Sequence, residues 1–310
     1  MKSCILPAGR LWRRARAWVS KAGGATMKNL LAVIGDGDAG SVLEAALKTA
    51  RRFNSHIVGL HSLTTEYAVV FGGEMGFSIS SEVDRTLERE GHERRDQARR
   101  LFRDVMNTQG VPIGEPAPGY VGPSASWREE DGRQNAIVGM TGRVYDMIFV
   151  EQPEKLASIA EATLEDALFE SGRPVMMVPK AVPPAMGEVI AIAWNGSTET
   201  ALTVALGMPF LKQAREVVIV AVGPQHMPEP GPTGDELART LARHGINVSM
   251  RPAYGRQKPQ GESFLKEAAA VGADLMIKGA YTQSRIRQMI FGGATRHMIM
   301  ESRIPMLMAR

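Results

Sequence analysis

The chain is short of the features that mark secreted, metal-binding and membrane proteins. Its 310 residues include one cysteine, Cys4, and six histidines, none of them paired at metal-ligand spacing. A single cysteine excludes an internal disulfide and a cysteine metal site, and it fits a reducing compartment. No apolar run approaches the roughly 20 residues that cross a bilayer. These scarcities predict a cytoplasmic protein without a membrane partner.

Acidic residues are missing from residues 1–27, which carry six of the 37 Lys and Arg side chains. Without that stretch, 31 basic residues face 33 acidic ones, so the body has a net charge of −2 rather than +4. A basic surface for nucleic acid is therefore not expected on the folded part. For residues 1–27 we expect an over-extended start or a disordered tail, with an organellar transit peptide as the alternative.

Strand-like and helix-like segments alternate through the body, and the series occurs twice. YDMIFVE at Tyr145 resembles ADLMIKG at Ala273, and SGRPVMMVP at Ser171 resembles ESRIPMLMA at Glu301. KNLLAVIGDGDAGS at Lys28 resembles GEVIAIAWNGSTET at Gly187. The expected strands are 30–34, 57–60, one after 110–123, 146–150, 174–178, 189–193, 217–222, 248–251, 275–277 and 306–308.

Helices are expected between these strands. Ser41 with Glu44 has the spacing of a capping box, and Ser197 is a second helix cap. The helix after Ser197 is predicted to bury one face, formed by Ala201, Val204, Ala205 and Met208. The other helices are expected near 82–107, 134–142, 235–244 and 262–271.

Continuous apolar strands that alternate with helices indicate parallel sheets covered on both faces. We therefore predict an α/β fold of two tandem doubly wound domains, each with a five-stranded parallel sheet flanked by helices. The domains are expected at 28–180 and 188–310, joined by the Pro- and Gly-containing linker 180–187. The methionines of the strands are interpreted as core residues rather than as an adaptable binding surface.

The segment Lys278–Thr295 carries the strongest functional signal. Gly279 ends a strand, and Gly292 and Gly293 open a helix that includes Thr295. Glycines at such junctions let a phosphate approach the backbone, and the N–H groups of a helix start attract its charge. The alternative is that both glycine positions are structural breaks without a ligand.

This pattern resembles the universal stress protein family in its tandem form, from about Lys28 to Arg310. The family signature is a glycine, two residues, a glycine, nine residues and another glycine, and it implies ATP binding. Here Gly279, Thr282 and Gly292 occupy those places, with Thr282 replacing the middle glycine. Asn195 stands where the family has an aspartate after its first strand, and Gly293 and Thr295 follow the last glycine.

The first half departs from that signature. The segment EQPEKLASIAEATLEDALFES after its fourth strand has no glycine and several acidic residues. Negative charge repels a triphosphate, so this half is not expected to bind nucleotide in the same way. Asp36–Gly37 is read as the counterpart of Asn195–Gly196.

A rival signal lies at Gly35–Gly40, which spells the dinucleotide-binding pattern G-x-G-x-x-G between a strand and a helix. No acidic residue follows at the end of the second strand, where the ribose would need one. An NAD-dependent oxidoreductase therefore stays a minor alternative. His61 and His297 are interpreted as packing and helix-face residues, so no catalytic set is predicted.

The resemblance implies a stress-response protein that binds ATP or AMP in its second domain. Mg²⁺ is the ion that would accompany ATP, although no protein ligand for it is visible. The residues that the resemblance implies as nucleotide contacts are Asn195, Gly279, Thr282, Arg285, Gly292, Gly293 and Thr295. The two domains are expected to form an internal pseudo-dimer, with a homodimer as a further assembly. A nucleotide-free interaction module and a weak ATPase remain alternatives.

Overall fold

The structure is a computed structural model that describes most of the chain. The described residues are 27–35, 39–63, 81–155, 157–223, 227, 230–253, 260–280 and 293–310. The basic stretch 1–26 and the segment 281–292 lie outside them. None of the helices in the described ranges is both long and apolar enough to cross a bilayer.

The N-terminal half alternates strands and helices. Its elements are β1 (Asn29–Val33), α2 (Gly40–Phe53), β2 (His56–Leu63), α4 (Ser81–Thr108), β3 (Ser124–Asp131), α5 (Gln134–Thr141), the short 3-10 helix η1 (Gly142–Val144), β4 (Met147–Glu151), α6 (Ile159–Glu170) and β5 (Val175–Val178).

The C-terminal half repeats this order. Its elements are β6 (Val189–Trp194), α7 (Thr198–Leu206), α8 (Met208–Leu211), β7 (Glu216–Ala221), α9 (Gly234–Arg243), β8 (Val248–Pro252), α10 (Gln260–Ala270), β9 (Leu275–Gly279), α11 (Gly293–Glu301) and β10 (Met306–Ala309).

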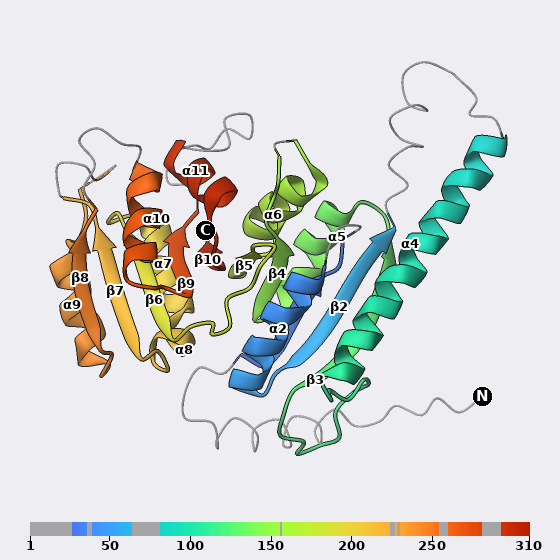
Figure 1. Ribbon diagram of the computed structural model, residues 1–310, viewed down its shortest axis with the longest axis horizontal. Coiled ribbons are helices and arrows are strands. Elements are labelled where there is room, and N and C mark those ends of the chain that lie inside the picture. The colour runs from blue at the N-terminus through green and yellow to red at the C-terminus, as the bar shows by residue number, and fades with distance from the viewer. Residues whose placement is uncertain are drawn as a thin grey trace, which may run out of the picture.

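The ten strands of the described residues belong to one sheet, in the order β3-β2-β1-β4-β5-β10-β9-β6-β7-β8 (Figure 1). Neighbours within each half pair in parallel, and β5 pairs with β10 antiparallel. Each half therefore has its own five-stranded parallel sheet with the same strand order. The predicted fold class is confirmed, and the structure adds that the two sheets are continuous.

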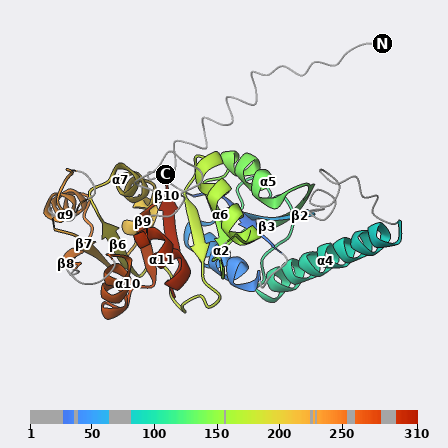
Figure 2. The ribbon, with the colours of Figure 1, turned by 90° about the horizontal axis from the view of Figure 1, so that it is seen from above.

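Helices cover both faces of the sheet (Figure 2). One buried cluster contains side chains of α2, α4, α7, α8 and α9, and the other contains side chains of α5, α6, α10 and α11. The strand methionines predicted as core are buried in these clusters, with Met176, Met177, Met276, Met306 and Met308 all fully buried. The interpretation of the strand methionines as core is therefore confirmed.

Side chains of α2 also join the two halves near the start of the C-terminal half. The Arg52 guanidinium donates to the Gln213 carbonyl at 2.7 Å and to Glu188 Oε1 at 3.1 Å. The Phe53 and Phe210 rings meet edge to face with their centroids 5.0 Å apart. The halves are thus held by helix contacts as well as by the β5–β10 pairing.

Two helix predictions are wrong. Helix α2 begins at Gly40 with Ala39 as its cap, and no side chain caps it, so Ser41 lies inside the helix instead of starting it. Ser197 does cap α7, because its side chain accepts from the Thr200 N–H. The predicted α7 face is displaced, since Ala201 and Ala205 are exposed.

Threonines take the place of those alanines against the sheet. Thr200 and Thr203 are fully buried. The Thr203 hydroxyl donates to the Glu199 carbonyl at 2.7 Å and accepts from the Ala309 N–H at 3.1 Å. Hydroxyls with satisfied hydrogen bonds can be buried at little cost, and a pattern of apolar residues does not reveal them.

The first strands of the two halves, β1 and β6, correspond in a register that differs by one residue from the match made in the sequence. Leu30 pairs with Met147, and Ile190 pairs with Leu275, so Leu30 corresponds to Ile190. The sequence comparison matched Leu30 to Val189, which lies in the other buried cluster. In a strand, a shift of one residue moves every side chain to the opposite face.

The corrected register shows that the turn after β1 is longer than the turn after β6. The helix cap Ala39 lies six positions after Val33 in the sequence. In the other half, the cap Ser197 lies four positions after Ala193, which corresponds to Val33. Counted from the strands, Asn195 corresponds to Gly35. Asp36 and Gly37 lie outside the described residues, so their equivalence with Asn195–Gly196 stays a prediction.

Candidate functional site

A buried polar cluster joins the carboxyl ends of β6 and β9 to the start of α7. Asn195 follows β6 directly, and its Oδ1 accepts from the Thr200 hydroxyl at 2.7 Å and from the Ser197 N–H at 3.3 Å. Thr200 Oγ1 in turn accepts from the N–H of Gly279, the last residue of β9, at 3.3 Å. The cluster lies where the strand order reverses, the usual place for a ligand in an open α/β sheet.

The predicted residues Asn195 and Gly279 are thus brought together. Because Asn195 Oδ1 is occupied by the protein itself, its amide N–H₂ is the group it can offer to a ligand. None of the described residues accepts a hydrogen bond from that nitrogen. Asn195 is therefore equipped to donate to a ligand rather than to accept from one.

Gly279 has a packing reason as well. A Cβ at this position would come within 2.3 Å of the Thr200 backbone nitrogen and 2.6 Å of the Glu199 carbonyl carbon. In the C-terminal half, the packing of α7 against β9 therefore requires a glycine at this position. The first half has Glu151 at the corresponding place.

Gly293 differs from Gly279 in this respect. Helix α11 begins at Gly293, as the sequence predicted, and no described atom lies within 4 Å of a Cβ added there. Thr295, in the first turn, is buried. Thr282, Arg285 and Gly292 lie outside the described residues, so the middle of the predicted phosphate cradle stays a prediction.

Lys278 is a residue that the sequence reasoning did not single out. It lies in β9 between Ile277 and Gly279, and it is only 5% exposed. Its ammonium donates to the Gly279 carbonyl at 3.1 Å. Burial lowers the pKa of Lys278 to about 8, and the negative charge of Glu199 acts in the opposite direction. The sequence did contain a signal for this residue, because Lys278 is a charged residue inside an apolar strand and its counterpart in β4 is Val150.

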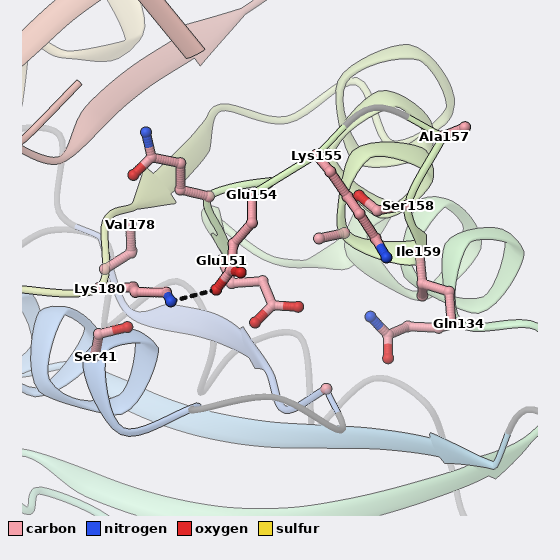
Figure 3. A pocket seen from close by; sticks show the side chains of 13 residues that line it. Ser41, Gln134, Glu151, Glu154, Lys155, Ala157, Ser158, Ile159, Val178 and Lys180 are labelled. Carbon is pink, nitrogen blue, oxygen red and sulfur yellow. Dashed lines mark ion pairs between the residues drawn. The ribbon is translucent and has the colours of Figure 1, made fainter. Parts of the chain in front are cut away.

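The N-terminal half has a cavity of about 600 Å³ at the same edge of its own sheet. Figure 3 shows Glu151, Lys155 and Gln134 among the side chains that line it. A Cβ at Gly35 would lie 3.4 Å from Glu151 Oε1 and 3.7 Å from the Gln134 amide, so these three residues meet on one side. The carboxylate of Glu151 thus occupies the region that corresponds to the polar cluster of the other half.

An ion pair and a helix start complete this cavity. Lys180 Nζ lies 2.6 Å from Glu154 Oε1, and both side chains are mostly exposed. Ser158 caps α6, with its Oγ accepting from the Glu161 N–H at 3.1 Å. Glu151 and Glu154 thus line this cavity together with Lys155 and Lys180, and the different treatment of nucleotides by this half stays a prediction.

The two histidines considered in the sequence have contrasting positions. His61 is buried, its Nδ1 donates to the Ile34 carbonyl at 2.8 Å, and its ring stacks on Trp127. His61 is thus a packing residue. His297 lines a cavity of about 340 Å³ formed with α10. Among the described residues, no three His, Cys, Asp or Glu side chains gather in a way that would hold a metal ion.

Comparison with known proteins finds similarity in structure and not in sequence. No protein-family model matches the chain, and no curated protein matches it. A universal stress protein from Archaeoglobus fulgidus DSM 4304 is similar with a TM-score of 0.64 and 14% identity, over 92% of this chain and 97% of that one.

Two proteins from Pseudomonas aeruginosa are similar as well. One, from strain UCBPP-PA14, is assigned to the universal stress proteins and gives a TM-score of 0.52 at 15% identity, over 91% of this chain and 93% of that one. The other, a protein of unknown function from strain PAO1, gives 0.51 at 15% identity, over 91% and 92%. Along most of its length, the chain therefore has the fold of universal stress proteins, as the signature had suggested.

Proposed function

We propose that the protein is a stress-response protein of the universal stress type that binds an adenine nucleotide, ATP or AMP, in its C-terminal half. Its role is to respond to the nucleotide rather than to turn it over, since the described residues of the site include no set of catalytic side chains. Mg²⁺ would accompany ATP through the phosphates and water.

The polar cluster of Asn195, Ser197, Thr200 and Gly279 is the observation that supports this most directly. It places the start of α7 at the reversal point of the strand order, where N–H groups and the helix dipole favour an anion. Helix α11 begins with Gly293, for which the described residues give no packing reason. An open glycine at a helix start suits the close approach of a phosphate.

Each predicted contact has a role in this proposal. The Asn195 amide donates to the ligand, and the Thr295 hydroxyl and the backbone at Gly293 face the phosphates. Gly279 holds the start of α7 beside the ligand through Thr200. Thr282, Arg285 and Gly292, outside the described residues, would complete the cradle. The N-terminal half lacks this set and presents Glu151 instead. A nucleotide is therefore expected to bind once per chain.

The two halves, as domains 28–180 and 188–310, would act as an internal pseudo-dimer around the β5–β10 junction. Because β5 and β10 pair on both sides, β3 and β8 are the strands at the ends of the sheet. A homodimer that extends the sheet would have to use one of these two strands.

Mass spectrometry of the nucleotide released from purified protein, followed by ATP titration calorimetry, tests the proposal. We expect ATP or AMP at about one per chain. Gly293→Glu should abolish binding by placing a carboxylate at the start of α11, while its melting temperature stays near that of the wild type. Ile159→Glu, at the first residue of α6, is the matched control and should leave binding intact.

The opposite pattern would move the site to the N-terminal half: binding lost in Ile159→Glu and kept in Gly293→Glu. A protein that carries no nucleotide and shows no thermal shift with millimolar ATP would overturn the proposal. In that case the nucleotide-free interaction module is the better account.

A further inference from the structure

The side chain of Lys278 is buried at the carboxyl end of β9, one residue before Gly279 of the polar cluster. Its neighbour along the sheet in β10 is apolar, because Lys278 pairs with Met308. The stem of Lys278 thus lies on the apolar face of the sheet. Its ammonium donates to the carbonyl of Gly279, the last residue of the strand.

Little in the described protein compensates that charge. One carbonyl accepts a hydrogen bond from an ammonium that has three to donate. The negative charge of Glu199, in the first turn of α7, favours the charged form, but no ion pair joins these two described side chains. A buried charge is costly unless it is paired and hydrogen-bonded, so a residue of this kind needs a reason.

The fold does not supply that reason. The N-terminal half builds the same strand with Val150, which is fully buried in the equivalent cluster. The strand order and the pairing of β4 and β9 are the same in both halves. A branched apolar side chain therefore satisfies the packing, and the lysine at 278 adds only a charge and its donors.

We propose that Lys278 provides the counter-charge for the phosphate groups of the ligand in the C-terminal half, so that this site selects a polyanion and not only a nucleoside. The inference rests on the proposed function. The burial-lowered pKa of Lys278 supports it, because an anion beside the ammonium would restore the stability of the charged form.

The test compares ligands of different charge in the full chain. The variants are Lys278→Met, which keeps the length of the side chain, and Lys278→Val, which copies Val150. Calorimetry at pH 7 with ATP, inorganic tripolyphosphate and uncharged adenosine gives the readout. We expect both variants to bind ATP and tripolyphosphate at least tenfold more weakly, with adenosine affinity unchanged.

Lys212→Met, an exposed lysine after α8, is the control and should bind all three ligands as the wild type does. A purely structural role for Lys278 would change the affinities for ATP and adenosine together. If ATP binds the wild type and both Lys278 variants equally, the inference is overturned while the proposed function stands. If the wild type binds neither ATP nor tripolyphosphate, both fall.

Discussion

Gly279, at the end of β9, lies directly against the backbone of Thr200 in the first turn of α7. The Gly279 N–H donates to the Thr200 hydroxyl at 3.3 Å, and a Cβ at 279 would approach the Thr200 nitrogen to 2.3 Å. This contact fixes the start of α7 over the end of β9. The glycine of the signature is therefore a structural requirement of the site, whatever ligand the site holds.

Gly279→Ala should destabilise the protein by about 3 kcal/mol, because the new methyl group meets backbone atoms that cannot rotate away. Gly293→Ala should change the free energy of unfolding by less than about 1 kcal/mol, since the described surroundings leave room and alanine favours a helix. Urea denaturation of both variants checks the difference. Equal stability of the two variants would mean that the contact between β9 and α7 is loose.

Most of the fold could be predicted because apolar strands and their spacing are local features of the sequence. The junction of the two sheets could not be predicted, since β5 and β10 are far apart in the chain and no sequence pattern specifies which strand edges pair. The one-residue error in matching Leu30 also has a physical origin: several apolar residues in a row, buried on both faces, leave the register ambiguous.

The site was predictable only in part. Asn195, Gly279 and Gly293 follow from a recognisable spacing, and the structure brings Asn195 and Gly279 into one cluster. The role of Thr200 could not be predicted, because it depends on the close approach of β9 to α7, which sequence spacing does not show. Lys278 was overlooked for the same reason, since only burial turns an ordinary lysine into an unusual one.

The stability of the protein should depend on pH through Lys278. Its pKa is about 8 in the folded state, below the usual 10.5, so between these values the unfolded state binds more protons and stability rises with pH. Below pH 8 the buried charge costs up to about 3 kcal/mol. Lys278→Met should thus be more stable than the wild type at pH 7, with the gap closing toward pH 10. Denaturation of both proteins at pH 7, 8.5 and 10 checks this, and a constant gap would contradict it.

Glu165 in α6 should give a pH dependence of the opposite sign. Burial, together with the nearby negative charges of Glu161 and Asp166, raises its pKa to about 7. Between the unfolded value near 4.5 and this folded value, the folded state binds more protons, so stability falls as pH rises. Glu165→Gln should remove that fall and stabilise the protein at pH 8. Thermal denaturation at pH 5, 6.5 and 8 measures it, and parallel curves for the wild type and the variant would exclude Glu165 as the cause.

Asp146 and Asp274 are corresponding carboxylates that hold the starts of β1 and β6. Asp146 Oδ2 accepts from the N–H groups of Lys28 and Asn29 at 2.6 and 2.9 Å. Asp274 Oδ1 accepts from three consecutive N–H groups, those of residues 187–189, at 2.7, 3.0 and 3.3 Å. Asp274 is also the more deeply buried of the two.

Removing either carboxylate leaves N–H groups without a partner, and the cost grows with their number and burial. We expect Asp274→Ala to lower the free energy of unfolding by about 3 kcal/mol and Asp146→Ala by about 1.5 kcal/mol. Asp274→Asn, which keeps one acceptor oxygen, should recover part of the loss. Urea denaturation ranks the three variants. If Asp146→Ala were the costlier change, burial would not determine the strength of these contacts. The N–H groups of residues 187–189 would then form hydrogen bonds to water after a local rearrangement in Asp274→Ala.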